Sequence, residues 1–384
     1  MSQNEHKTDW RANGPPIFCG IRDSYSPRQR EFFPPEFLAG LPLDAGVTFF
    51  FVLSGFILSH VYSEKGIRGG LSRFYVARFA RLWPAHAFCT LMLLACIPYQ
   101  RELLESASNV YTLILNLLML HAAVPIPDVY FSFNAVSWSI STEIFFYMAF
   151  PLLLLWFSST PVLKLCAAIA FGGLFAYALD ALGVVYYAAD KLNQISSHGL
   201  VYISPVSRIQ EFMLGIVCQR LLSGAQLDAV KKGPATVLEI LAILSIIFVT
   251  PFLSSSASVI VGASHIALSE FFRHSSMALL FAAVITCFYM DKGIVSRALS
   301  WRPLVFLGEI SFSVYLIHQV VIRLTTQEQL LFDYGPYTRF WFVAITSIAC
   351  AALIWKFVEK PCQKGIMRFY DLTRPKLKPS ESVN

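Results

Sequence analysis

Long apolar runs alternate with short polar loops along most of the chain. Each run is close to the roughly 20 residues that a helix needs to cross the hydrocarbon core of a bilayer. A transmembrane barrel would instead show segments of about ten residues that alternate in polarity. The pattern therefore predicts about ten membrane-spanning helices, at roughly 45–62, 82–99, 110–124, 138–158, 162–187, 205–222, 235–253, 275–290, 303–322 and 338–357.

The composition agrees with lipid as the solvent of this chain. Of its 384 residues, 56% are hydrophobic and 14% are charged, whereas a soluble globular protein carries about 25% charged residues. Because a helix satisfies its own backbone hydrogen bonds in hydrocarbon, the predicted fold class is an all-α, polytopic transmembrane helical bundle. The net charge of +6 is modest, and it is typical of cytoplasmic loops rather than of a nucleic-acid partner.

The chain divides into three parts by polarity. Residues 1–44 form a polar N-terminal tail, residues 45–361 a single membrane domain, and residues 362–384 a basic tail. The eight cysteines form no CxxC pair. No Walker loop, GxSxG elbow, HExxH motif or metal-ligand spacing is present, which argues against ATPases, hydrolases and zinc enzymes, and we expect no metal site.

Lysines and arginines in short loops predict the orientation of the spans. Four basic groups should all be cytoplasmic, the C-terminal tail included: Lys65–Arg81, Arg220–Lys232, Lys292–Arg302 and Lys356–Arg368. The last three groups agree with one another, because two spans separate each neighbouring pair. The first and second disagree, because five predicted spans lie between them. One segment within 82–222 should therefore be re-entrant, broken or missing from this count of spans, and the polar stretch 188–204 is the expected place.

The charge pattern also bears on the start of the chain. If the first basic loop is cytoplasmic, the polar tail lies outside although it carries several Lys and Arg residues. This conflict favours one more helix before Gly46.

Arg78 and Arg81 lie in the stretch FYVARFARLWP. Side chains three residues apart share one face of a helix, and two guanidiniums can hold phosphates with charge-assisted hydrogen bonds. The alternative is a pair of cytoplasmic anchors with snorkelling side chains. Trp83 and Pro84 follow directly and favour a position at the membrane interface.

Two further candidates are ionisable groups inside predicted spans, where charge is costly and often functional. Ser139, Glu143 and Tyr147 share a helix face, and the helix dipole favours a carboxylate near the start of that helix. Glu143 is therefore either functional or a cap of the helix end. Tyr315 and His318 share another face with Ser311; His318 could move a proton or could pack through a hydrogen bond.

A third pair of ionisable groups, Arg208 and Glu211, is interpreted as an intrahelical ion pair that neutralises two charges.

Six stretches in this order resemble the acyltransferase-3 family of integral membrane acyltransferases, which modify bacterial surface sugars. They are GVTFFFVLSGFILS, FYVARFARLWPAH, WSISTEIFFYMAFPLLL, SRIQEFMLGIV, LGEISFSVYLIH and FVEKP, from Gly46 to Pro361. The resemblance implies transfer of an acyl group, usually acetyl, from cytoplasmic acyl-CoA (acetyl-CoA) to a hydroxyl of a surface or exported carbohydrate or glycolipid, such as lipopolysaccharide or exopolysaccharide. It also implies a multi-pass protein of the bacterial inner membrane with no bound cofactor.

The resemblance implies roles for the residues that match the motifs of the family. It implies that one set binds substrates: Arg78, Arg81, Trp138, Ser139, Ser141 and Tyr315. It gives Glu143 and His318 support roles in catalysis. The family normally opens with a helix that carries the His thought essential for catalysis. The region before Gly46 contains only His6, in the polar tail, so this chain is expected to lack that helix and that His. A glycan or lipid transporter and a truncated, inactive family member remain as alternatives.

Overall fold

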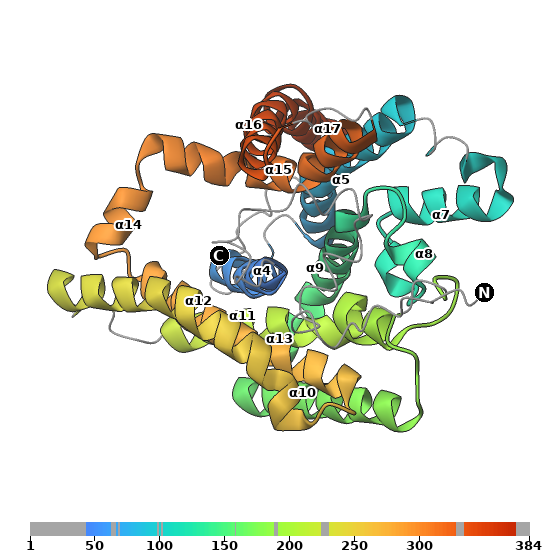
Figure 1. Cartoon of the computed structure of the whole chain (residues 1–384). Helices are drawn as coiled ribbons and strands as arrows, with labels where there is room; N and C mark the ends of the chain where they lie inside the picture. The colour runs from blue at the N-terminus through green and yellow to red at the C-terminus, as the bar shows by residue number, and fades with distance from the viewer. Residues whose placement is uncertain are drawn as a thin grey trace, which may run out of the picture.

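The computed structural model describes residues 44–373 except 63–66, 68–69, 98–99, 101–102, 158, 188–190, 224–229 and 328–333. Within this part, nine helices are long and apolar enough to cross a membrane, which confirms the all-helical polytopic fold (Figure 1). They are α4 (Ala45–Tyr62), α5 (Leu71–Cys96), α9 (Trp138–Trp156), α10 (Pro161–Ala181), α11 (Pro205–Ser223), α12 (Lys232–Val261), α13 (Ile266–Tyr289), α15 (Arg302–Gln327) and α16 (Pro336–Ile354).

The two predicted tails are described only in part. Residues 1–43, and with them the expectation of a missing first helix, lie outside the described residues. At the other end, α16 continues through a π-helical turn, Trp355–Glu359, into α17 (Lys360–Thr373). The predicted start of the basic tail at residue 362 therefore falls inside a helix. Residues 374–384 also lie outside the described part of the chain.

The apolar run predicted as a span at 110–124 does not cross the membrane. Its helix, α7 (Ala107–Leu117), has 11 residues and rises only about 16 Å, which is too short for a hydrocarbon core of about 30 Å. The chain then continues in three short pieces, the 3₁₀ turn His121–Ala123, α8 (Pro127–Tyr130) and the 3₁₀ turn Ala135–Ser137. The break expected at 188–204 thus lies at 110–124, and four helices separate the first two basic groups.

Side-chain hydrogen bonds to the backbone hold this bend. Asn116 Nδ2 donates to Ser132 O at 3.1 Å, and Asn116 O lies 2.8 Å from His86 Nε2. Ser141 Oγ donates to Met119 O at 2.8 Å and accepts from Ala122 N at 3.0 Å. Polar groups that would be costly inside a straight span are therefore satisfied by turning the chain.

Two histidines are buried inside the same bend. The rings of His86 and His121 stack with centroids 6.3 Å apart, and both side chains are fully buried. His121 Nε2 lies 3.2 Å from Ser137 Oγ. Burial, reinforced by the neighbouring His86, lowers the pKa of His121 to about 3. This imidazole is therefore neutral at physiological pH.

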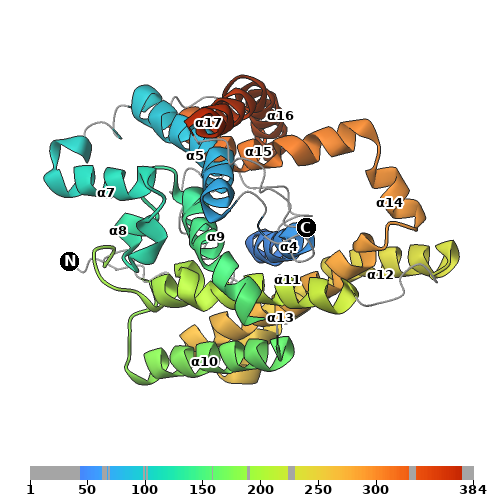
Figure 2. The same ribbon diagram turned by 180° about the vertical axis from the view of Figure 1, so that it is seen from behind.

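Helix α4 lies at the centre of the molecule. Figures 1 and 2 show it between α5, α15, α16 and α17 on one side and α10 to α13 on the other. Its contact with α11 is close enough to require glycine on both helices. A Cβ atom at Gly55 would lie 2.0 Å from Phe212 O, and one at Gly215 would lie 2.0 Å from Val52 O. Small residues that let two backbones approach are a common device of membrane helices.

Candidate functional site

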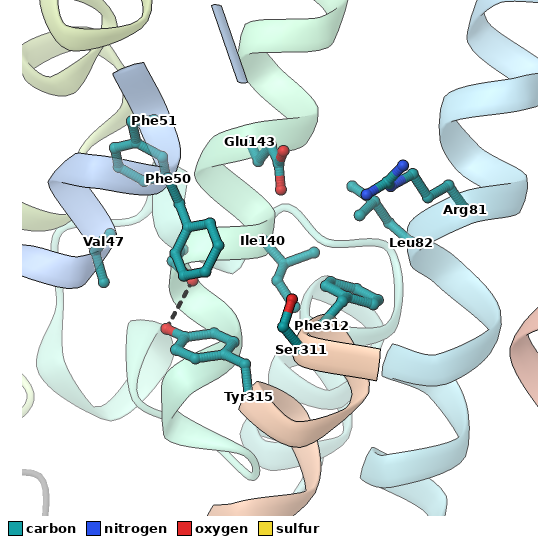
Figure 3. A pocket seen from close by; sticks show the side chains of 11 residues that line it. Val47, Phe50, Phe51, Arg81, Leu82, Ile140, Glu143, Ser311, Phe312 and Tyr315 are labelled. Atoms are coloured by element: carbon teal, nitrogen blue, oxygen red, sulfur yellow. Dashed lines mark hydrogen bonds between the residues drawn. The ribbon is translucent and has the colours of Figure 1, made fainter. Parts of the chain in front are cut away.

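Four helices that are distant in sequence enclose a pocket of about 110 Å³. Figure 3 shows its lining, contributed by α4, α5, α9 and α15. The lining residues are Val47, Phe50, Phe51, Arg81, Leu82, Ser139, Ile140, Glu143, Ser311, Phe312 and Tyr315. The structure thus brings one predicted arginine, the predicted carboxylate and the Ser–Tyr stripe of the late helix into one site.

Hydrogen bonds orient the carboxylate of Glu143. Ser54 Oγ of α4 donates to Glu143 Oε1 at 3.0 Å, and the hydroxyl of Tyr147, one turn further along α9, donates to the same oxygen. The described residues provide no hydrogen bond to Oε2. Figure 3 shows the carboxylate and the guanidinium of Arg81 directed toward one another. Glu143 therefore presents one bound and one available oxygen.

Hydroxyl groups lie on the other side of the pocket. Tyr315 OH lies 2.8 Å from Ser139 Oγ, and each of these hydroxyls lies within 3.1 Å of the carbonyl oxygen of Val136. The start of α9 is tied to α15 by two more bonds, from Asn134 Nδ2 to Leu316 O at 2.9 Å and from Val136 N to Gln319 Oε1 at 3.2 Å. This wall is therefore rigid and rich in hydrogen-bonding groups.

The two predicted arginines occupy different positions around the same carboxylate. Arg81 is exposed and lines the pocket. Arg78 lies behind it, with its guanidinium carbon 5.8 Å from the ring centroid of Tyr147 and 5.9 Å from that of Phe74. Its Nε atom is buried and has no hydrogen-bond partner among the described residues. Both cations thus lie on one side of the site, as their spacing predicts.

Besides Arg78, three predicted site residues lie outside the pocket lining. Trp138 is buried behind the wall, with its ring 6.4 Å from that of Phe51 and 4.9 Å from that of Tyr202. Ser141 binds the backbone of the 119–122 bend. His318 lies one turn beyond Tyr315, its ring centroid 5.9 Å from that of Tyr315. Their predicted roles remain predictions.

A buried network of charges adjoins the pocket wall. Arg208 and Glu211 form the predicted i, i+3 ion pair at 3.1 Å. Arg208 also donates to Thr48 Oγ1 at 3.0 Å, and Thr48 Oγ1 lies 3.4 Å from Nδ1 of His274. Arg208 further lies 5.2 Å from the ring centroid of Phe51, which lines the pocket. The Arg208–Glu211 ion pair is therefore one end of a larger network of buried polar groups.

The rest of the network connects α13 to the start of α4. Arg273 forms an ion pair with Asp44 and donates to His274 Nε2 at 2.9 Å. Because a guanidinium only donates, Nε2 of His274 accepts, and its proton resides on Nδ1 facing Thr48. Glu270 accepts from Tyr186 at 2.9 Å and lies 2.9 Å from His198. The sequence did hold one signal for them, because Glu270 and Arg273 of α13 form an i, i+3 pair at 4.0 Å, whereas Asp44, Tyr186 and His198 come from distant segments.

Among the described residues, no group of three or more His, Cys, Asp or Glu side chains is placed to hold a metal ion. The chemistry that the site offers is therefore that of a carboxylate, hydroxyls and guanidiniums inside a membrane bundle. This set is suited to binding an anionic donor and to activating a hydroxyl.

The fold is that of a polytopic helical membrane protein, and comparison with known sequences shows its class. Residues 24–356 match the acyltransferase domain of the acyltransferase-3 family. The chain belongs to this family: it is a multi-pass membrane acyltransferase that transfers groups other than aminoacyl groups. Family membership thus supports the enzyme over the transporter.

Two relatives illustrate the match. The chain is 29% identical over 344 residues to the acyltransferase MdmB of Streptomyces mycarofaciens, covering 84% of this chain and 81% of that protein. It is 25% identical over 354 residues to the peptidoglycan O-acetyltransferase OatA of Listeria monocytogenes, covering 85% of this chain. The match covers only 52% of the length of OatA. No solved structure matches the chain significantly.

Proposed function

We propose that this chain is an O-acyltransferase that moves an acyl group, in particular acetyl, from acyl-CoA to a hydroxyl of a surface or exported carbohydrate or glycolipid. The observation that carries the proposal is the pocket in which Arg81 of α5 faces Glu143 of α9. A cation beside a carboxylate with one available oxygen suits an anionic donor and a hydroxyl acceptor. The name of OatA supports acetyl as the group and a glycan as the acceptor.

The arrangement of basic groups supports a cytoplasmic donor. With four spans between the first and second groups and two between each later pair, all four basic groups lie on one side of the membrane. The excess of Lys and Arg makes this side cytoplasmic, so the C-terminus is cytoplasmic in a bacterial inner membrane. Helix α5 starts on the same side, and Arg78 and Arg81 lie in its first three turns, within reach of CoA.

Arg78 and Arg81 bind the phosphates of CoA in this proposal. Their guanidiniums supply directed donors that phosphate oxygens accept. Binding there directs the thioester toward the pocket, where Phe50, Phe51 and Phe312 offer apolar surface for the acyl group. In this proposal the apolar lining keeps water away from the thioester and so limits its hydrolysis.

The acyl transfer itself uses the polar groups of α9 and α15. The acceptor hydroxyl binds to the available oxygen of Glu143, and its oxygen attacks the thioester carbonyl as Glu143 relays the hydroxyl proton. The new C–O bond forms, the C–S bond breaks, and CoA leaves as the thiol with that proton. Ser139 and Tyr315 accept hydrogen bonds from the substrate hydroxyls, because their own protons are engaged with Val136 O and with each other. His318 supports Tyr315 from the next turn.

The proposal is tested by transfer of radiolabelled acetyl from acetyl-CoA to membrane polysaccharide. The double variant Arg78→Ala/Arg81→Ala should lose transfer, whereas Arg302→Ala, which removes an exposed arginine of the same side on α15, should retain it. Unchanged transfer by the double variant would refute the docking role. If the wild-type chain binds CoA and transfers nothing, it is an inactive family member.

A further inference from the structure

Helix α17 carries a basic row and an apolar row side by side. Lys360, Lys364 and Arg368 follow one another at four-residue intervals, so at 100° per residue they lie within an arc of about 80°, which also holds Asp371. The adjoining third carries Phe369 and Leu372. These two side chains are 71% and 84% exposed, so a continuous apolar row remains open to the surroundings.

A different side of α17, from Tyr370 round to Asp371 at the edge of the basic row, contacts α5 (Figure 1). Tyr370 OH lies 2.8 Å from Ser72 Oγ, and Asp371 forms an ion pair of 2.6 Å with Arg73. These contacts fix the rotation of α17 about its axis. The apolar row therefore lies on the side away from α5, and Lys364 and Arg368 lie between that row and Asp371.

The length of the continuous helix locates α17 relative to the bilayer. From Pro336 to Thr373 it has 38 residues and would extend about 57 Å, whereas the hydrocarbon core is about 30 Å thick. The last 14 residues, which form α17, thus reach beyond the hydrocarbon into the headgroup region. A helix with adjacent basic and apolar rows is suited to that region.

The exposed cations of α17 favour anionic lipids over neutral ones. Lys360 is engaged within the protein, 3.5 Å from Glu309 and 3.6 Å from the ring centroid of Trp355. Lys364 and Arg368 are exposed and have no ion-pair or hydrogen-bond partner among the described side chains. Two exposed cations beside a membrane-facing apolar row complement an anionic phospholipid.

We propose that α17 is a binding site for anionic phospholipids. Lys364 and Arg368 bind the headgroup phosphates, and Phe369 and Leu372 lie in the interfacial region, at the boundary of headgroups and acyl chains. Through Ser72 and Arg73, the bound lipid also holds the first turn of α5 in place. This inference goes beyond the acyl transfer and does not depend on it.

Hydrogen exchange of residues 360–373 in the full chain, held in nanodiscs, tests the proposal. Each basic residue near an anionic surface contributes about fivefold, so exchange of α17 should be about 25-fold slower in phosphatidylglycerol than in phosphatidylcholine. The variant Lys364→Gln/Arg368→Gln should lose this difference. The control Lys231→Gln/Lys232→Gln, an exposed pair at the start of α12, should keep it. Exchange in α4 reports whether each variant is folded.

Three results would overturn the proposal. The first is equal exchange of α17 in the two lipids. The second is loss of the difference in the α12 control as well. The third is protection that appears only in nanodiscs with two copies of the chain, which would assign the apolar row to a second copy. The variant Phe369→Ser/Leu372→Ser should speed exchange in both lipids, because it removes the apolar contribution without changing the charge.

Discussion

Tyr147 should act as a positioning residue for Glu143, and Tyr147→Phe isolates that role. The substitution removes only the hydroxyl that donates to Glu143 Oε1. The buried ring keeps its place, 5.8 Å from the guanidinium carbon of Arg78. Ser54 then provides the remaining hydrogen bond at 3.0 Å. The carboxylate stays in the pocket but loses one of its two orienting contacts.

The expected loss follows from the strength of the bond removed. A hydrogen bond to a charged group contributes about 1.5–3 kcal/mol, which corresponds to about 10–150-fold in kcat. The KM for acetyl-CoA should stay within about twofold, since Arg78 and Arg81 are unchanged. Ser54→Ala should have a loss of the same order. The double variant should lose more than either, because Oε1 is then left without a protein donor.

The assay is transfer of radiolabelled acetyl by purified chain in nanodiscs, over a range of acetyl-CoA concentrations. The matched control is Tyr75→Phe, which removes an exposed hydroxyl that donates to Met148 O at 3.2 Å and lies outside the pocket lining. A kcat for Tyr147→Phe equal to that of the wild type would refute the reasoning. So would an equal fall in kcat for Tyr75→Phe.

Three further outcomes are expected. Gly215→Val should destabilise the detergent-purified chain by about 3 kcal/mol, measured by thermal unfolding, because the side chain overpacks against α4. The control Gly308→Val should reduce the stability less, because no atom lies within 4 Å of the added Cβ. Because the pKa of His121 is lowered to about 3, the unfolded state binds more protons below pH 6.5. Stability should therefore fall by about 1.4 kcal/mol per pH unit there, and acid titration of His121→Gln should lack this contribution. In single-cysteine variants, an impermeant maleimide outside the cell should label exposed Cys96 but not exposed Cys362. The reverse labelling pattern would show that the proposed orientation is wrong.

Local patterns predicted much of the site because its chemistry recurs at helical spacing. The i, i+4 interval placed Glu143 beside Tyr147, and their hydrogen bond follows from that interval alone. The same periodicity aligned Ser311 with Tyr315, which both line the pocket. The orienting contact from Ser54 could not be predicted, because it joins residues 89 positions apart.

The partners within the buried charge network could not be predicted from the sequence for the same reason. Arg208 and Glu211 were visible as a pair, but the partners of Arg208 and Arg273 lie 160 and 229 positions away. A single ionisable residue in an apolar run gives no sign of which other helix will neutralise it. Only the packing of α4 against α11 and α13 determines that Asp44 and Thr48 are those partners.

The bend at 110–124 has the largest consequence for function. Hydropathy alone predicted a span there, since the polar groups of Asn116 and His121 are few among many apolar residues. Their partners come from α5 and from the start of α9, and these bonds keep the segment on one side. Helix α9 consequently runs from the far face toward the basic face, opposite to α5.

This antiparallel arrangement determines where the two reactants can meet. Arg81 lies ten residues, about 15 Å, from the start of α5, and Glu143 lies five residues, about 8 Å, from the start of α9. The guanidinium and the carboxylate therefore meet inside the helical bundle, each carried by a helix that enters the pocket from a different end. A donor held by the arginines would enter from the basic face, while an acceptor would reach Ser139, one turn before Glu143, from the opposite face. Had 110–124 crossed the membrane, α9 would run parallel to α5, and both sets of groups would open to the same side.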